Sequence, residues 1–148
     1  MARINAYPSS STINASDTVI GTNSQNLRTE NYTIAQIGQV ALGYIAYAAI
    51  LSQSSTDDPV ATVLKNDTGA TYTWTRTNIG VYEITNSDGL FNKDTTLVFG
   101  NIGAQVKPFY FRWRVVNANV IEVTTYDETG TAADKVFNKG SFEIRIYS

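Results

Sequence analysis

The stretch ATYTWTRTNIGVYEIT, residues 70–85, begins with a strict two-residue alternation, which indicates a β-strand. Its threonines fall on one face of an extended chain, and they are Thr71, Thr73, Thr75 and Thr77. Tyr72, Trp74 and Arg76 fall on the other face. Because threonine suits an exposed strand surface, we expect Tyr72 and Trp74 to lie in a core and Arg76 to reach water where the strand ends. The open alternative is an exposed platform that stacks a sugar or a base.

Short segments with strand-like patterns, separated by turn sequences, surround this stretch. NIG at residues 78–80 connects two of them as a hairpin, and Asn117-Ala118 connects two more. About seven or eight short strands with frequent turns are typical of an antiparallel sandwich or jelly roll. We therefore predict an all-β domain over residues 44–148. The expected strands after residue 54 cover residues 60–66, 71–77, 81–85, 96–102, 108–116, 119–127 and 141–148.

Residues 44–53, YIAYAAILSQ, fit two patterns. A helical stripe of apolar side chains would contain Ile37, Val40, Tyr44, Tyr47 and Leu51. One face of a strand would instead contain Ile45, Tyr47, Ala49 and Leu51. The helical pattern spans too few heptads to indicate a coiled coil. We favour the strand because the chain that follows is all β, and the helix stays open as the alternative.

The first 43 residues are polar and rich in turn-forming sequences, with only short apolar patches. They predict an extended arm with one or two short strands and a short helix over about residues 33–42. Thr33 is a plausible N-cap for that helix. Such a segment is too poor in apolar residues to hold a core, so we expect it to become ordered on another surface.

Composition excludes several classes of function. The chain contains no Cys and no His, so disulfides, zinc–thiolate sites and a conventional Ser-His-Asp triad are impossible. With 11 basic against 13 acidic side chains, the chain lacks the basic excess of a non-specific nucleic-acid binder. The sequence contains no phosphate-binding glycine motif, and its carboxylates fall mostly in turns. We therefore expect no enzyme activity, no cofactor, no metal site and no nucleic-acid partner.

The longest apolar run, VALGYIAYAAIL at residues 40–51, is shorter than the roughly 20 residues that span a bilayer. The first residues lack the apolar core of a secretory signal. We therefore expect synthesis in a cytoplasm and no membrane span.

A second aromatic stretch, FYFRWRVV at residues 109–116, supplies candidate binding residues. The core-facing positions are expected to be Phe109, Phe111, Trp113 and Val115. Tyr110, Arg112 and Arg114 would then share the other face. The arginines could pair with Glu122 on the neighbouring strand, lie at a subunit interface, or bind an acidic ligand. The candidate ligand-binding residues are Arg76, Tyr110, Arg112 and Arg114.

Four segments together resemble a C-terminal module of phage virion proteins. They are YIAYAAILSQSSTDDPVATVLKNDTG, TYTWTRTNIGVYEIT, NVIEVTTYD and FEIRIYS. This module is found in phages of Bacteroidetes-type hosts, including crAss-like phages. The resemblance covers residues 44–148 and favours a strand over residues 44–53.

The front segment NASDTVIGTNSQNLRTENYTIAQIGQVAL is similar to a stretch near the start of phage fibre and adsorption proteins. Taken together, the resemblance implies a head fibre or vertex spike, or a tail-fibre-like protein, that forms a homotrimer in the virion. Residues 1–43 would contact a capsid or other virion protein. The implied anchoring residues are Ile4, Tyr7, Val19, Ile20, Tyr32, Ile34 and Ile37. The expected subunit-interface residues are Val40, Tyr44, Tyr47 and Leu51.

The expected function is therefore multivalent display in a virion assembled in a bacterial cytoplasm, without catalysis. The main alternative is a carbohydrate-binding module or tail-fibre adhesin that recognises a glycan on the host surface. A third class, a small glycan-degrading enzyme, would need two carboxylates about 5–10 Å apart in a cleft.

Overall fold

The computed structural model describes residues 12–103 and 108–147. The chain divides into two compact units, Met1–Gly43 and Tyr44–Ser148. Within the described residues, no helix is long and apolar enough to cross a membrane.

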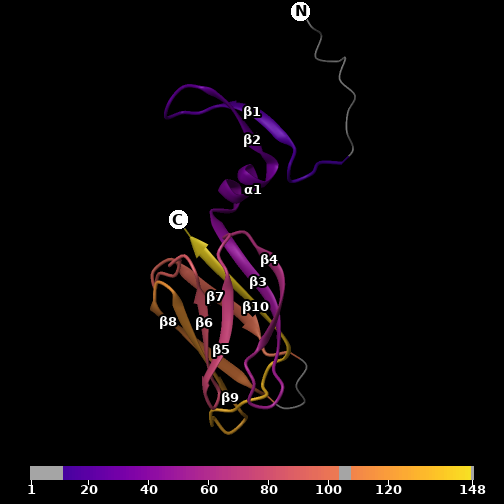
Figure 1. Ribbon diagram of the computed structural model, residues 1–148, viewed down its shortest axis with the longest axis vertical. Coiled ribbons are helices and arrows are strands. Elements are labelled where there is room, and N and C mark those ends of the chain that lie inside the picture. Colours follow the sequence, from indigo (N-terminus) through magenta and orange to yellow (C-terminus); the bar gives the residue numbers. More distant parts are fainter. Residues whose placement is uncertain (1–11, 104–107, 148) are drawn as a thin grey trace, which may run out of the picture. The chain divides into compact units, whose positions relative to one another are not determined.

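The first unit contains an antiparallel hairpin and one short helix (Figure 1). Strand β1 (Thr18–Thr22) pairs with β2 (Thr29–Thr33), and helix α1 (Ile34–Leu42) follows directly. Thr33 is the N-cap: its Oγ1 accepts the Gln36 N–H at 3.1 Å, and Gln36 Oε1 accepts the Thr33 N–H at 2.8 Å. This reciprocal capping box fixes where the helix begins. Gly43 ends it in the left-handed conformation, so the predicted short helix is confirmed.

The first unit exposes most of its apolar side chains. Helix α1 contains no buried residue, and Val40 is 84% exposed. Ile20 on β1 is 70% exposed. A two-stranded sheet and a nine-residue helix are both marginal without further packing. This unit therefore has little core of its own among its described residues.

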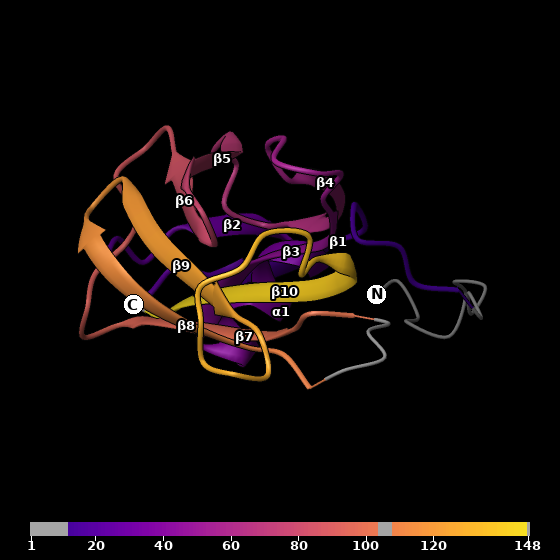
Figure 2. The ribbon, with the colours of Figure 1, turned by 90° about the horizontal axis from the view of Figure 1, so that it is seen from below.

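The second unit is a sandwich of two four-stranded antiparallel sheets (Figures 1 and 2). One sheet has the order β4-β3-β10-β7, and the other has the order β5-β6-β9-β8. Their strands are β3 (Tyr44–Ser52), β4 (Val60–Asn66), β5 (Tyr72–Asn78), β6 (Val81–Asn86), β7 (Thr96–Asn101), β8 (Tyr110–Asn117), β9 (Val120–Tyr126) and β10 (Asn138–Tyr147). The predicted antiparallel β-sandwich is confirmed, and residues 44–52 form a strand rather than a helix.

Alternate side chains from the two sheets meet in a single core. Trp74 on β5 is only 4% exposed, and its indole ring meets the Phe142 ring of β10 edge-on, with centroids 5.2 Å apart. Tyr72 is partly buried and stacks on Tyr47 of β3 at 4.0 Å. The Tyr72–Trp74 face therefore points inward, as predicted, and does not form an exposed stacking platform. The buried strand residues of this core include Tyr47, Ala49, Leu51, Trp74, Tyr82, Ile84, Val98, Ile121, Val123, Phe142 and Ile144.

The prediction that Tyr47 and Leu51 lie at a subunit interface is wrong. Both side chains are fully buried inside the sandwich of their own chain. Because residues 44–52 form a strand, residues two apart share a face, and Tyr47 and Leu51 both point into the core. Tyr44 is partly exposed, its ring lying 5.3 Å from that of Tyr147, and Val40 is exposed. For these two residues the interface stays a prediction.

Candidate functional site

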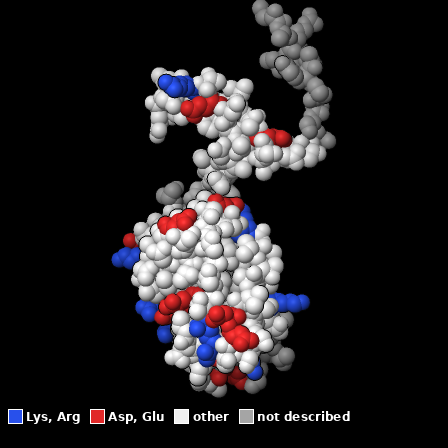
Figure 3. All heavy atoms as spheres, in the orientation of Figure 1, with Lys and Arg blue, Asp and Glu red and all other residues white. Residues whose placement is uncertain are grey.

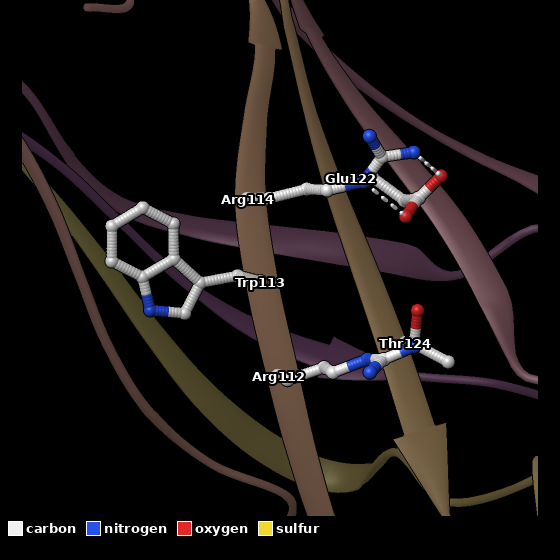
Figure 4. A pocket seen from close by; sticks show the side chains of 5 residues that line it. All are labelled: Arg112, Trp113, Arg114, Glu122 and Thr124. Atoms are coloured by element: carbon white, nitrogen blue, oxygen red, sulfur yellow. Dashed lines mark hydrogen bonds and ion pairs between the residues drawn. The ribbon is translucent and has the colours of Figure 1, made fainter. Parts of the chain in front are cut away.

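Three of the four predicted ligand-binding residues lie on one exposed face of β8. Tyr110, Arg112 and Arg114 occupy alternate positions and are exposed, whereas Phe111 and Trp113 are partly buried against the core. Figure 4 shows Trp113 pointing away from the side on which both arginines lie. The two-residue period of the strand therefore separates binding candidates from core residues, as the sequence predicts. Trp113 is only partly covered because β8 is an edge strand.

Strand β9 places a matching set of side chains beside them. The register pairs Tyr110 with Tyr126, and Arg112 with Thr124. The two tyrosine rings stack with centroids 5.1 Å apart and planes 16° from parallel. The Arg112 guanidinium lies 5.3 Å from the centre of the Tyr126 ring, within the range of a cation–π contact. Tyr110 remains 50% exposed, so part of this aromatic pair is open to solvent.

Arg114 is paired with Glu122, the residue opposite it on β9. Its Nε and Nη2 donate to the two carboxylate oxygens of Glu122 at 2.8 and 2.9 Å (Figure 4). These hydrogen bonds lower the pKa of Glu122 and raise the pKa of Arg114. The structural pairing that the sequence suggested is thus present, and Arg114 carries no uncompensated charge. An exposed pair of this kind contributes little to stability.

Arg112 differs from Arg114 in its surroundings. Among residues 12–103 and 108–147, no carboxylate forms an ion pair with Arg112, which faces Thr124 across the ladder. Beyond Thr124 the next strand presents Val81, so this row of the sheet holds no acid. Arg112, Arg114, Glu122 and Thr124 line a shallow pocket of about 280 Å³. The site is therefore an open, polar depression with one cation available to a ligand, beside two stacked rings.

Arg76, the fourth candidate, lies elsewhere and is engaged within the fold. Its Nε and Nη2 donate to the two Asp134 carboxylate oxygens at 2.9 and 2.8 Å. The Gly80 N–H also donates to Asp134, and the Tyr82 hydroxyl lies between Asp134 and the Gln53 side chain. The hydrogen bonds from Arg76 lower the pKa of Asp134, and burial raises the pKa of Tyr82 to about 12. Nothing in this arrangement supports a role for Arg76 in ligand binding.

Two features of these sites were not singled out from the sequence. Tyr126 and Thr124 share the face of Glu122 in the stretch NVIEVTTYD, and a hairpin about Asn117 places them opposite Tyr110 and Arg112. Alternation and hairpin register would have found them. Asp134 carries no such signal, because it lies in a loop and meets a strand residue 58 positions away.

A second carboxylate of this face is placed next to Glu122. Glu83 on β6 is the register partner of Glu122, so two carboxylates lie on neighbouring strands. Glycoside hydrolysis needs one carboxyl with a raised pKa to act as the acid, but the pKa of Glu122 is lowered by Arg114. Within the described part of the chain, no group of three or more acidic side chains is placed to hold a metal ion.

Comparisons with protein-family models, with curated proteins and with solved structures gave no match for this chain.

Proposed function

We propose that the protein is a non-enzymatic structural component of a phage virion, a head fibre or vertex spike. Residues 1–43 anchor it, and the sandwich of residues 44–148 projects outward as part of a homotrimer. The proposal starts from the resemblance of both segments to phage virion proteins. The observation that carries it is the exposure of the apolar side chains in the first unit, where helix α1 has no buried residue.

The anchoring step follows from that exposure. Val19, Ile20, Ile37 and Val40 are all exposed within the first unit. Tyr32, Ile37 and Val40 also line one apolar depression along α1. Covering such side chains gains roughly 25 cal/mol for each Å² removed from water, which favours docking on a partner surface. Tyr32 and Ile34 are partly buried, and Ile4 and Tyr7 lie outside the described residues.

Trimerisation would raise the avidity with which the displayed domains bind a surface. Charged residues make up 16% of the chain, and Figure 3 shows broad areas of the sandwich surface without any charged side chain. Three copies of a weak surface site, repeated over a particle, raise avidity by roughly 10²–10⁴ without a tight single site. Light scattering on the purified chain should give three times the 16.2 kDa mass of one chain. A monomer at all concentrations would overturn this part of the proposal.

The anchoring proposal is tested in the phage that encodes the chain. We expect mass spectrometry of gradient-purified particles to detect the protein. The double variant Ile20→Asn, Ile37→Asn should be lost from particles, because both are predicted anchoring residues that are exposed within the first unit, Ile20 on β1 and Ile37 on α1. Ala35→Asn, on the opposite side of the same helix, is the matched control and should be incorporated normally. Particles that lack the wild-type protein, or that contain the double variant at normal levels, would contradict the proposal.

A second candidate function, saccharide recognition, is favoured by the half-exposed Tyr110 ring. The Tyr126 ring stacks against the Tyr110 ring, and the Arg112 guanidinium lies near Tyr126. Sugars stack their apolar C–H faces on such rings while polar groups beside the ring fix their orientation. Tyr110→Ala should abolish binding of a saccharide ligand, whereas Tyr110→Phe should retain it because the ring remains. Equal binding by the alanine variant would rule this face out.

A further inference from the structure

We propose that the outer face of β8 and β9 recognises an acidic saccharide, with Arg112 binding its carboxylate. This inference rests on the second candidate function, saccharide recognition, and narrows it to one class of ligand. Uronic and sialic acids are the saccharides that carry such a carboxylate on the sugar ring.

The charge balance of the pocket lining favours an anionic ligand. Two arginines and one paired carboxylate line the pocket, and Glu122 is held by Arg114 in a bidentate ion pair. Arg112 contributes to the lowered pKa of Glu122, but only as the weakest cause and without a hydrogen bond. Glu83, the register partner of Glu122 on β6, does not line the pocket, so the pocket lining itself keeps one positive charge, that of Arg112. A ligand carboxylate could pair with Arg112 in the same way that Glu122 pairs with Arg114.

The surroundings of Arg112 also suit a carboxylate. A guanidinium presents its flat face to an aromatic ring and its N–H donors in the plane of the group. The Arg112 guanidinium carbon lies 5.3 Å from the centre of the Tyr126 ring, and the guanidinium forms no hydrogen bond with the described residues, so its N–H donors are available for two parallel bonds to a carboxylate. Because the ring already restricts this long side chain, binding costs less conformational entropy.

The spacing of side chains along β8 suits a sugar ring. Tyr110 and Arg112 point to the same side of the strand, two residues and hence about 6.8 Å apart. That separation is comparable with the width of one sugar ring. A sugar stacked on Tyr110 thus brings a carboxylate on the same or the adjoining ring to Arg112. The Glu122–Arg114 pair closes the far side of the pocket.

The overall charge of the chain would not attract an acidic saccharide. The net charge is −2, so long-range electrostatics oppose an acidic ligand and only a local cation favours it. Binding through Arg112 should also weaken as salt is raised, because an exposed ion pair is screened over a Debye length of about 8 Å at physiological ionic strength.

The test compares acidic oligosaccharides with their neutral counterparts. Tetragalacturonate, a hyaluronan tetrasaccharide and sialyllactose are each titrated beside their carboxyl methyl esters, with binding to the full chain followed by NMR and calorimetry. At least one acid should bind, and its ester should bind about tenfold more weakly because a charge-assisted bidentate contact is lost. Arg112→Gln should reduce binding of the acid by the same factor. Lys65→Gln, in β4 of the other sheet, removes one charge as well and should bind like wild type.

The outcomes separate the two proposals. If acids and esters bind alike and both depend on Tyr110, saccharide recognition stands and the acidic preference is refuted. Binding of an acid that is unchanged in Arg112→Gln also refutes it. If none of the six compounds binds, both proposals fail. Circular dichroism of Arg112→Gln, together with the Arg112→Lys variant that keeps the charge but not the bidentate fork, distinguishes a lost contact from a lost fold.

Discussion

Two bidentate arginine–carboxylate pairs among the described residues allow the effect of burial on an ion pair to be tested. Their N–O distances are 2.8–2.9 Å in both cases. The Asp134 side chain, however, is only 12% exposed, its arginine is 20% exposed, and the carboxylate also accepts the Gly80 N–H. The Glu122 side chain is 24% exposed, and its arginine is 66% exposed. Removing each carboxylate should therefore have very different effects on stability.

The expected magnitude follows from the groups that lose their partner. Asp134→Ala leaves a guanidinium, the Gly80 N–H and the Tyr82 hydroxyl without this acceptor. Breaking a buried pair costs roughly 3–5 kcal/mol, and some water can reach this site, so we take about 3 kcal/mol for Asp134→Ala. Asp134→Asn keeps one acceptor oxygen but loses the negative charge. Because hydrogen bonds to charged groups contribute more than neutral ones, this variant should still lose about half as much stability as Asp134→Ala.

Urea denaturation followed by tryptophan fluorescence measures these losses. With an m-value of about 2 kcal/mol/M, Asp134→Ala should lower the midpoint by about 1.5 M. Glu122→Ala is the matched control and should move the midpoint by less than about 0.5 M, as exposed pairs usually do. Equal shifts for the two alanine variants would refute the claim that burial and additional hydrogen bonds, rather than ion-pair geometry, set the contribution.

Three further predictions concern pH, backbone conformation and the core. Because the pKa of Asp134 is lower in the folded state than in the unfolded state, the stabilisation by its carboxylate is present above about pH 4 and is lost as the pH falls through the folded-state pKa. The difference in free energy of unfolding between wild type and Asp134→Asn, measured in urea, should therefore stay constant above about pH 5 and shrink below about pH 4. Gly80→Ala should destabilise the fold more than Gly69→Ala. Both glycines have positive φ, a backbone conformation that costs a residue with a Cβ about 1–2 kcal/mol. A Cβ at Gly80 would also lie 2.6 Å from the Ala133 backbone nitrogen, whereas a Cβ at Gly69 would have no atom within 4 Å. Phe142→Ala should cost about 3–5 kcal/mol in a thermal or urea melt, because the ring is buried between both sheets; a loss below 1 kcal/mol would contradict its central place in the core.

Local pattern was enough to predict much of this structure. The alternation in residues 71–77 identified a strand whose Trp74 side faces the core. Thr33 was predicted as the N-cap of a short helix, and the structure has a capping box at that position. The pairing of Arg114 with Glu122 follows from two strands joined by a tight turn. All three depend on residues near one another in the chain, where a two-residue or helical period fixes which side chains meet.

Contacts between distant segments were decided by the tertiary structure alone. For residues 44–51 the pattern fitted a helix or a strand, and pairing of β3 with β10, about ninety residues later, selects the strand and buries Tyr47 and Leu51. Arg76 was left open as a surface contact because its partner, Asp134, lies in a loop 58 residues away. Periodicity within one segment carries no information about which other segment will cover it. The sequence by itself therefore determined the strands and which of their faces point inward. The packing of the two sheets decided which polar side chains form pairs and which, like Arg112, form no ion pair with the described residues.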